Sequence, residues 1–481
     1  MPRSWPLVSL LLACRPVPTE TTPPDATPPT PTAKPDQDST PKFFSGSVEL
    51  PGAALPFFVA LRPQDVSYLG TIDIPLQGTR GLPLQNLIYD GKSLSFALEI
   101  VAATWTITLD DEGESTACEL TQAGATFPCT LTTIDGSAFA TLTSPKRPQT
   151  PKPPFPYPTR DVKIASGTIE LAGTLALPTG PGPHPAAVLI TGSGAQDRDE
   201  TLFDHKPFLV LADHLARQGI ATLRLDDRGI GGSTGDLSQV TTADLAADVN
   251  AAVAFLQTQP EIDRKRIGVL GHSEGGIVGP AAAAKNEGIA FVVMLAGTGV
   301  TGEQIVVKQT ELITRKSGMA AADVAKAVEQ QRQIFKALHA EKDESKARAR
   351  IAEIIGTTGP VDDAAPTPQI DILFSPWFRA FMAHDPRPVL TKLKVPVLAL
   401  VGELDLQVDA EQNLPEIEKA LKKGKNKRVT TRRMPGLNHL FQRAQTGLVT
   451  EYGTIEETMS PEVLSIVSAW ILDVAKPSKA P

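Results

Sequence analysis

The sequence predicts an α/β protein, in which a mostly parallel sheet is covered by helices on both faces and follows a small all-β domain. Two observations carry this prediction. After residue 159, continuous runs of Val, Ile, Leu and Ala alternate with helical patterns, which is typical of parallel strands buried on both faces. Between residues 43 and 142, apolar side chains instead recur at every second position, as in strands with one buried face.

The composition limits the classes of function. The chain has 481 residues, a formal net charge of -8 at pH 7 and only three cysteines. This length suggests two or three domains and provides material for a large core. The mildly acidic balance argues against nucleic acid as the main partner.

The first 42 residues predict export. In residues 1–14, one positive charge precedes an apolar stretch that is too short to span a bilayer as a helix. We interpret it as a lipoprotein-type signal peptide, because Leu-Leu-Ala-Cys at residues 11–14 resembles the bacterial lipobox, in which the cysteine (here Cys14) is lipidated. An ordinary signal peptide is the alternative. Residues 15–42 are rich in proline and threonine and predict an extended tether, so we expect a lipid-anchored protein of the bacterial outer membrane or periplasm.

Residues 43–143 predict a small all-β domain, either a sandwich or a barrel. Turns are expected at residues 90–91 and 112–113, which read Asp-Gly and Glu-Gly. Nothing in this domain indicates catalysis, so binding a polymer and shielding an enzyme both remain open as its role. The expected strands place alternate side chains on one face: Val66, Tyr68, Gly70, Ile72 and Ile74; Leu94, Phe96, Leu98 and Ile100; and Trp105, Ile107 and Leu109.

Cys118 and Cys129 lie in two runs of this domain that are joined at Gly124, so a hairpin could bring them together. If Cys14 is lipidated, the remaining cysteines form an even pair in an oxidising compartment, which favours a disulfide. Two free buried thiols are the alternative, because a sequence does not give the distance between the Cα atoms.

A second proline-rich stretch, residues 144–158, is expected to be a linker. The apolar runs beyond it predict the strands of the parallel sheet. The clearest runs are residues 186–190, 221–225, 267–270, 291–295 and 397–401.

Ser273 is the candidate nucleophile. It lies in Gly-His-Ser-Glu-Gly at residues 271–275, between the apolar run 267–270 and a helix of small residues that begins near Ile277. A serine hydroxyl attacks a carbonyl only if it stands clear of its own backbone, and the two glycines leave room for the strand and the helix to approach. An ordinary glycine-rich turn between strand and helix is the alternative.

From about residue 160 to 471 the chain resembles the α/β-hydrolases, most closely bacterial carboxylesterases near the serine aminopeptidase-like and dienelactone hydrolase-like branches. The resemblance implies the α/β-hydrolase fold, with a catalytic core of residues 159–297 and 395–475 and a helical cap at residues 298–394. Its motifs stand in the order of the family: Thr-Gly-Ser-Gly-Ala-Gln-Asp-Arg-Asp-Glu at 191–200, Asp-Arg-Gly-Ile-Gly-Gly-Ser at 227–233, Gly-His-Ser-Glu-Gly at 271–275, Ser-Pro-Trp-Phe at 375–378, Gly-Glu-Leu-Asp at 402–405 and Asn-His at 438–439.

A serine nucleophile needs a general base and an acid that orients this base. His439 is the best base, because its loop follows the last strand-like run and precedes a final helix. Asp405 follows the run 397–401, at the carboxyl end of a strand, where active-site groups collect. Ser273, Asp405 and His439 also have the chain order of the family. The alternatives are Glu403 and Asp409 for the acid and His205 for the base.

The resemblance also implies an oxyanion site, in which backbone N–H groups stabilise the developing negative charge. The expected donors are the N–H of Ser193, or of its neighbour Gly194, and the N–H of Glu274 after the nucleophile.

In the cap, the aromatic segment 374–381 is expected to lie over the nucleophile. Trp377, Phe378 and Phe381 would then form an apolar wall for the substrate. Packing inside a helical layer is the alternative for each of them.

Three functions remain. An ester hydrolase would form an acyl-enzyme on Ser273 and act on small-molecule esters with short to medium acyl chains. A peptidase or amidase could use the same residues, and a surface-tethered binding protein could use a degenerate hydrolase scaffold. We favour the ester hydrolase, because the set of Ser, Asp and His is complete and segment 374–381 offers no anchor for a peptide amine. The sequence contains no metal-ligand cluster and no phosphate loop, so neither a metal nor a cofactor is predicted. The oligomeric state is not indicated.

Overall fold

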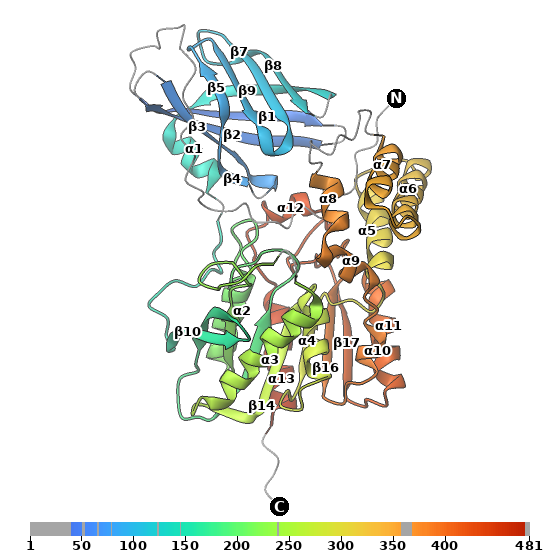
Figure 1. Ribbon diagram of the computed structural model, residues 1–481. Coiled ribbons are helices and arrows are strands. Elements are labelled where there is room, and N and C mark those ends of the chain that lie inside the picture. Colours follow the sequence, from blue (N-terminus) through green and yellow to red (C-terminus); the bar gives the residue numbers. More distant parts are fainter. Residues whose placement is uncertain are drawn as a thin grey trace, which may run out of the picture. The chain divides into compact units, whose positions relative to one another are not determined.

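The computed structural model describes residues 40–476, apart from 51–52, 65–66, 78, 123–124, 145, 238–239 and 357–367. The signal peptide with Cys14, and the tether up to residue 39, lie outside the described residues. The chain divides into two compact units (Figure 1). The β unit comprises described residues 40–146 and 449–456, and the α/β unit comprises 147–448 and 457–476.

The β unit contains one antiparallel sheet of nine strands in the order β4-β3-β2-β1-β9-β8-β7-β6-β5. The sheet curls towards a closed barrel, because the N–H of Leu84, between β4 and β5, donates to the carbonyl of Gly70 on β3 (2.9 Å). Its interior is filled by aromatic and branched side chains, and Phe96 stacks on Trp105. The strands are β1 (Lys42–Leu50), β2 (Ala53–Gln64), β3 (Ser67–Ile74), β4 (Thr79–Pro83), β5 (Gln85–Tyr89), β6 (Ser93–Leu98), β7 (Ala103–Leu109), β8 (Ser115–Gln122) and β9 (Ala125–Ile134).

Three details of the β unit differ from the prediction. Lys42 belongs to β1 and not to the tether. β6 ends at Leu98, so Ile100 is not in the strand but in a 3-10 turn (Glu99–Val101) that Ala102 closes in the left-handed conformation, with φ 47°. The unit is also not purely β, because Asp135 caps a helix, α1 (Gly136–Thr143). The 3-10 turn at Glu99–Val101 contains neither Gly nor Pro, so no turn residue marks the end of the strand there.

Cys118 on β8 and Cys129 on β9 are joined by a disulfide, with their Cα atoms 4.9 Å apart. The two strands are antiparallel neighbours, and the register places Glu119 opposite Pro128, so the cysteines face each other directly across the pair. The hairpin therefore supplies the short Cα separation that a disulfide requires.

The α/β unit contains an eight-stranded sheet in the order β10-β11-β13-β12-β14-β15-β16-β17. Strands β10, β11 and β13 pair antiparallel, and all pairs from β13 to β17 are parallel, which confirms the predicted mostly parallel sheet. The strands are β10 (Thr159–Ser166), β11 (Ile169–Ala176), β12 (His184–Ile190), β13 (Ala221–Leu225), β14 (Ile262–His272), β15 (Val292–Leu295), β16 (Val397–Gly402) and β17 (Val429–Met434).

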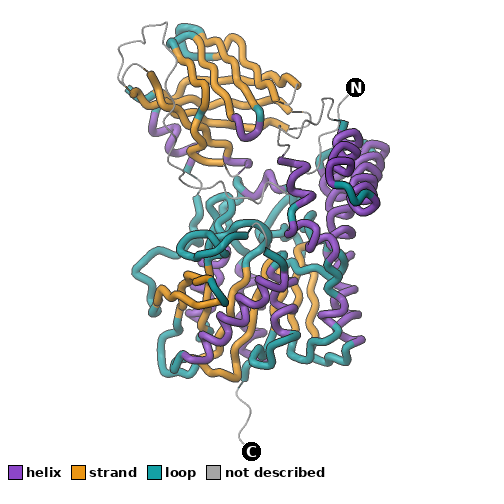
Figure 2. Tube along the Cα trace, in the orientation of Figure 1, coloured by secondary structure: helices purple, strands orange, loops and turns teal. Residues whose placement is uncertain are grey.

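Helices cover both faces of this sheet (Figure 2). On one face lie α3 (Thr242–Thr258), α4 (Gly275–Ala283) and α11 (Ala410–Lys423). On the other lie α2 (Pro207–Arg217) and α13 (Pro461–Val474). In the part of the chain that is described, every helix is too short or too polar to cross a membrane.

The stretch predicted as a linker is instead packed on the α/β unit from Arg147 onward. Arg147 donates to the carbonyl of Phe203 (2.8 Å), and Gln149 donates to the carbonyl of Met459 (2.8 Å). Tyr157 is buried against helix α2 and strand β11. From Arg147 onward, the proline-rich stretch is therefore an ordered segment of the α/β unit.

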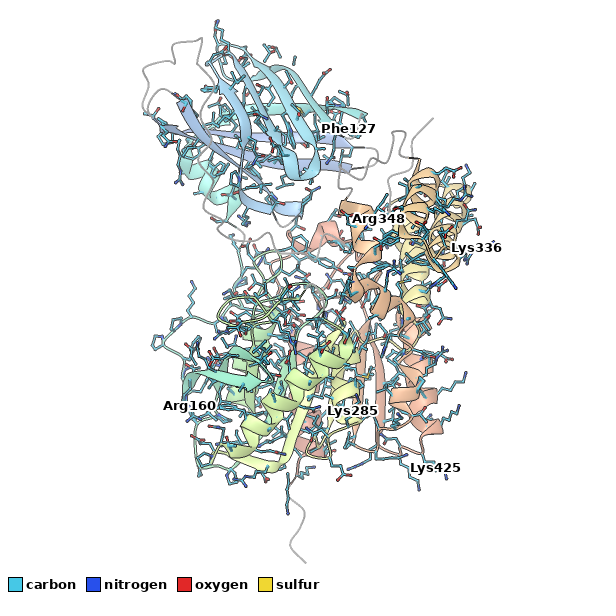
Figure 3. The ribbon with its side chains drawn as sticks, viewed as in Figure 1. Phe127, Arg160, Lys285, Lys336, Arg348 and Lys425 are labelled. Carbon is cyan, nitrogen blue, oxygen red and sulfur yellow. A yellow bond between two sulfur atoms is a disulfide. The ribbon has the colours of Figure 1, made fainter. Side chains whose placement is uncertain are left out.

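The predicted cap contains α5 (Gly302–Lys316), α6 (Ala321–Ala340), α7 (Glu344–Ile355), α8 (Pro368–Phe374) and α9 (Pro376–Ala383). These helices share a small apolar core of their own. Arg348 of α7, labelled in Figure 3, lies 4.4 Å from the ring centroid of Phe374 and donates to Asp371, which joins α7 to α8. The cap ends before residue 394, because Leu390 of α10 (Arg387–Leu390) and Leu393 pack in the core of the sheet.

Candidate active site

Ser273 lies in a tight turn between β14 and α4, with φ 52°, a left-handed conformation that is strained for a residue with a side chain. A Cβ at Gly271 would collide with the carbonyl of Gly275, and one at Gly275 with the carbonyl of Ile190. The N–H of Ser273 donates to the carbonyl of Leu295 (2.8 Å), which ties the turn to β15. The turn therefore requires glycine two positions before and two positions after the half-buried Ser273.

Asp405 and His439 meet at the carboxyl ends of β16 and β17. His439 Nδ1 lies 2.8 Å from Asp405 Oδ2, and both side chains are buried. The other carboxylate oxygen of Asp405 accepts the N–H groups of Gln407 (2.9 Å) and Val408 (2.8 Å). Because the ring donates its Nδ1–H to a fixed carboxylate, Nε2 is the nitrogen that can take up a proton.

The loops that carry Ser273 and His439 lie side by side. The ring of His272, next to Ser273, is 4.8 Å from the ring of His439 between centroids. Among the described residues, no hydrogen bond joins Ser273 Oγ to His439 Nε2, and the recorded bond of the His439 ring is to Asp405. In free enzymes this contact is commonly long and shortens when substrate binds.

The turn after β12 lies against the Ser273 turn, because a Cβ at Gly192 would be 3.4 Å from Ser273 Cβ. Within the described residues, the backbone N–H groups of Ser193, Gly194 and Glu274 donate to no protein acceptor. Glu274 begins helix α4, where N–H groups have no partner inside the helix. The three N–H groups are therefore available to a ligand oxygen beside Ser273.

A buried carboxyl fixes the turn after β12. Asp227 accepts the hydroxyl of Thr191 (2.8 Å) and the N–H of Gln196 (2.9 Å). Burial raises the pKa of Asp227 to about 8, against these hydrogen bonds.

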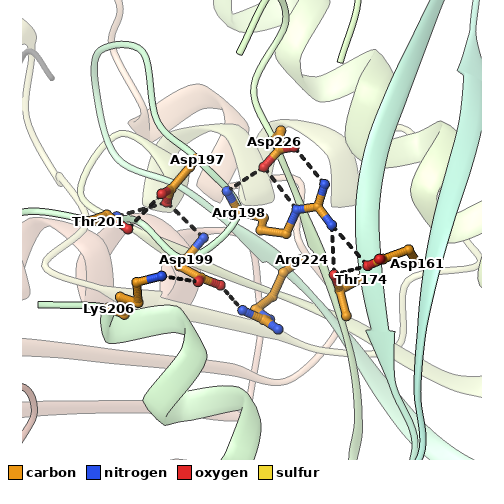
Figure 4. A network of polar contacts seen from close by, with 9 residues as sticks. All are labelled: Asp161, Thr174, Asp197, Arg198, Asp199, Thr201, Lys206, Arg224 and Asp226. Atoms are coloured by element: carbon orange, nitrogen blue, oxygen red, sulfur yellow. Dashed lines mark hydrogen bonds and ion pairs between the residues drawn. The ribbon is translucent and has the colours of Figure 1, made fainter. Parts of the chain in front are cut away.

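An ion network holds the loop that follows (Figure 4). Arg198 pairs with Asp226 (2.7 Å), and Asp199 pairs with the buried Arg224 and with Lys206. Asp197 accepts the backbone N–H and the hydroxyl of Thr201, which closes the loop on itself. These charges are structural, since each is paired within the loop or with strand β13 or its end.

The cap reaches the Ser273 turn through Trp377 on α9. Its indole Nε1 lies 3.0 Å from each carboxylate oxygen of Glu274. Burial raises the pKa of Glu274 to about 7, and the hydrogen bond from Trp377 opposes this rise. Phe381 stacks on Trp377, with 5.9 Å between ring centroids and 10° between ring planes.

The ring of Phe378 lies 6.1 Å from that of Trp377 between centroids and is fully buried inside the cap. Phe378 and Met382, four positions apart on α9, are buried in the apolar core of the cap, and Trp377 and Phe381 are partly buried and pack against the same core. That Phe378 lines the substrate site stays a prediction, and its ring is fully buried in the cap core.

The alternative acids and base have other partners. Glu403 pairs with Arg433 (2.7 Å), and Asp409 caps helix α11 by accepting the N–H of Gln412. His205 is fully buried and lies 2.8 Å from the hydroxyl of Thr458. No hydrogen bond recorded among the described residues joins any of the three to Ser273 or to the His439 ring.

Two contacts of the site were not predicted: the pair of His272 with Glu200 (2.9 Å) and that of Trp377 with Glu274. A signal existed for the first, since a histidine precedes the nucleophile and an acidic run spans residues 197–200. The partners are 72 positions apart, and only the fold joins them. Within the described residues, no group of three or more His, Cys, Asp or Glu could hold a metal ion.

The chain is similar to several known proteins. Residues 206–443 match the family described as serine aminopeptidase, S33. Esterase EstD of Thermotoga maritima is 27% identical over 240 residues, which are 50% of this chain and 50% of that protein, so the chain spans about half the length of this relative. The chain is also similar to a Pyrococcus furiosus esterase (17% identity, 66% of this chain and 91% of that chain, TM-score 0.40). A Penicillium α/β-hydrolase has 19% identity, covering 66% of this chain and 98% of that chain, with a TM-score of 0.41.

The strand order and the Ser273 turn define a mostly parallel α/β fold with a strained turn between strand and helix, and the two sequence matches are to a serine aminopeptidase family and to an esterase. The segment that matches the serine aminopeptidase family, residues 206–443, runs from the start of α2 to the loop after His439 and includes both Ser273 and Asp405.

Proposed function

We propose that the protein hydrolyses carboxylic esters through an acyl-enzyme intermediate, with Ser273 as nucleophile, His439 as general base and Asp405 as the acid that orients the base. The observation that carries this proposal is the 2.8 Å contact between His439 Nδ1 and Asp405 Oδ2, beside the turn that presents Ser273. Similarity to an esterase supports an ester as the substrate.

In the first half-reaction, Ser273 Oγ attacks the ester carbonyl carbon while His439 Nε2 accepts the hydroxyl proton. The carbonyl oxygen becomes an oxyanion, which the N–H of Glu274 and that of Ser193 or Gly194 stabilise. When the bond to the alcohol oxygen breaks, His439 gives its proton to that oxygen. The alcohol leaves, and Ser273 carries the acyl group.

The second half-reaction repeats these steps with water. His439 takes a proton from the water as its oxygen bonds to the acyl carbon, and then returns a proton to Ser273 Oγ as that bond breaks. Asp405 stays ionised and stabilises the imidazolium in both halves. The products are the carboxylic acid and the free enzyme.

We propose short to medium acyl chains, because Trp377 and Phe381 offer a stacked, partly exposed pair of rings next to Glu274. A peptidase or amidase on the same residues is the second candidate, since residues 206–443 match a family described as serine aminopeptidases.

The test compares kcat/KM for nitrophenyl butyrate with kcat/KM for alanyl and prolyl nitroanilides, using Ser273→Ala as the control. We expect the ester to be preferred and the control to be inactive. If an anilide is preferred to every ester, the enzyme is a peptidase.

We also propose that the protein is exported and anchored through lipid on Cys14, on the basis of residues 1–42 alone. Cells fed labelled fatty acid should give labelled, membrane-bound protein, whereas Cys14→Ser should be unlabelled. Label that persists on Cys14→Ser would exclude the anchor.

A further inference from the structure

A second histidine–carboxyl pair lies directly behind the proposed triad. His272, at the end of β14, and Glu200, in the loop after β12, are both buried. The ring nitrogen Nδ1 of His272 lies 2.9 Å from Glu200 Oε1, and Nε2 lies 3.0 Å from the backbone carbonyl of His439. Glu200 itself has φ 54°, so the loop holds it in a strained conformation.

The partners of His272 determine where its protons are. A carbonyl oxygen can only accept, so Nε2 must carry a proton to hydrogen-bond to His439. On the other side, Glu200 Oε1 also accepts the N–H of Gly192 (2.7 Å). One more proton must therefore lie between Nδ1 and Oε1, and in an ionised pair it makes the ring an imidazolium. Burial lowers the pKa of His272, but the Glu200 carboxylate, the hydrogen bond to His439 and the Asp405 carboxylate all raise it, and the net direction is upward.

These contacts join three loops that have different tasks. Gly192 precedes Ser193, one of the expected oxyanion donors. The N–H of Gly192 donates to Glu200. His272 precedes the nucleophile, and the carbonyl that it holds belongs to the general base. Asp405 fixes the ring of His439, whereas His272 fixes its backbone.

We propose that Glu200 and His272 are positioning residues for ester hydrolysis, and that their ion pair keeps the oxyanion turn, the Ser273 turn and the His439 loop in one arrangement. This inference rests on the function proposed above. Neither residue touches the substrate, and both act through the groups that do.

The pair predicts an alkaline limit to activity. The charged and titratable groups around the His272 ring are Glu200 from the loop after β12, Asp405 from the loop after β16 and His439 from the loop after β17. When the ring loses its proton at high pH, it has one N–H for two acceptors, so either Glu200 or His439 loses its contact. The value of kcat should then fall.

The variants Glu200→Gln and His272→Gln remove the charge with little change of size. An amide oxygen in the place of Oε1 still accepts from Gly192 but leaves the ring without a counter-charge, so the ring loses its proton at lower pH. For nitrophenyl butyrate, we expect kcat to be about 10- to 100-fold lower in both variants, with a smaller change in KM. A displacement of the reacting groups by about 1 Å reduces the rate by about this factor. The alkaline limb should move to lower pH in Glu200→Gln and be absent in His272→Gln.

The matched controls are Glu170→Gln and His184→Gln, which lie on strands β11 and β12 and outside the site. They should keep the kcat and the pH profile of the parent. If both site variants also keep them while Ser273→Ala is inactive, the positioning role is overturned.

A measurement without substrate separates this proposal from the proposed function. In the full chain with 15N-labelled histidine, NMR at neutral pH should show both ring nitrogens of His272 protonated, with the signals identified by their loss in His272→Gln. One bare ring nitrogen would overturn the ion pair, whether or not the enzyme cleaves esters. A protein with this imidazolium and no esterase activity would refute the proposed function and the positioning role, but not the pair.

Discussion

The interiors of the two units contain different side chains. Within the described residues, Thr143 is the only buried polar residue of the β unit, and the rest of its interior is aromatic and aliphatic. The α/β unit buries many polar and charged side chains, among them Glu200, His272, Asp405 and His439 at the carboxyl ends of its strands. Burying such groups costs free energy unless they are paired, so their concentration marks where the protein gives up stability for chemistry.

This difference predicts that substitutions in the two units have opposite profiles. In the α/β unit, replacing a buried polar group of the site should reduce activity far more than stability. In the β unit, a disruptive change should reduce stability and leave the turnover of a small soluble ester intact.

The largest effect is expected at the nucleophile and the base. Ser273→Ala and His439→Ala should each reduce kcat for nitrophenyl butyrate by up to about 10⁶-fold, and the double variant should be no worse, because the two residues act as a unit. Thermal unfolding should change little. Ester turnover that survives in Ser273→Ala would remove the proposed mechanism.

Asp405→Asn should follow, with kcat lower by about 10⁴-fold, because an amide no longer fixes the tautomer of the base. Asp409→Asn is the matched control, since Asp409 only caps α11 and an asparagine caps equally well. Equal losses of kcat in these two variants would mean that the acid has been misassigned.

Glu274→Gln should reveal the cost of a buried charge. The pKa of Glu274 is raised from 4.5 to about 7, so the folded protein binds this proton more tightly than the unfolded chain. The wild type therefore loses stability as pH rises from about 4.5 to 7, by up to about 3 kcal/mol, and the variant does not. The melting temperature of the variant minus that of the wild type should be greater at about pH 8 than at about pH 5. The exposed Glu170→Gln is the control, and an equal difference at both pH values would contradict the assignment.

The smallest effect on activity is expected in the β unit. Replacing Cys118 and Cys129 by alanine should lower the free energy of unfolding by about 2 to 3 kcal/mol, as expected for so short a loop. The kcat for a soluble ester should not change. Calorimetry of the full chain measures the change in the free energy of unfolding. Complete alkylation of both thiols in the native, unreduced protein would show that the disulfide does not form.

The sequence predicted the parts of the fold that rest on strong local patterns. Strands β12 to β16 each overlap one of the predicted runs, although β14 begins earlier, at Ile262, and the glycines around Ser273 mark a turn that other residues could not form. Asp405 and His439 could be singled out because each follows a predicted strand, and the structure brings them within hydrogen-bonding distance.

What the sequence did not predict depends on direction or on distant partners. Ile100 continues the alternation of its strand, although the chain turns there. The side chain of Phe378 could face the site or the cap core, and only packing of the neighbouring helices decides between them. The proline-rich residues after 146 gave no sign of Gln149, whose side chain holds the backbone at residues 458 and 459. Such contacts arise only when the chain has folded.

The contact between Trp377 and Glu274 affects attempts to exchange caps between hydrolases. The Glu274 carboxylate accepts the indole N–H of the cap, so a transplanted cap without an indole or another donor at this point would leave a buried acid without its hydrogen bond. Because Glu274 is the N-cap of helix α4, a displaced Glu274 would also disturb the packing of this helix on the sheet. In a hybrid enzyme, the hydrogen-bond donor to Glu274 should therefore be chosen before the apolar residues of the cap.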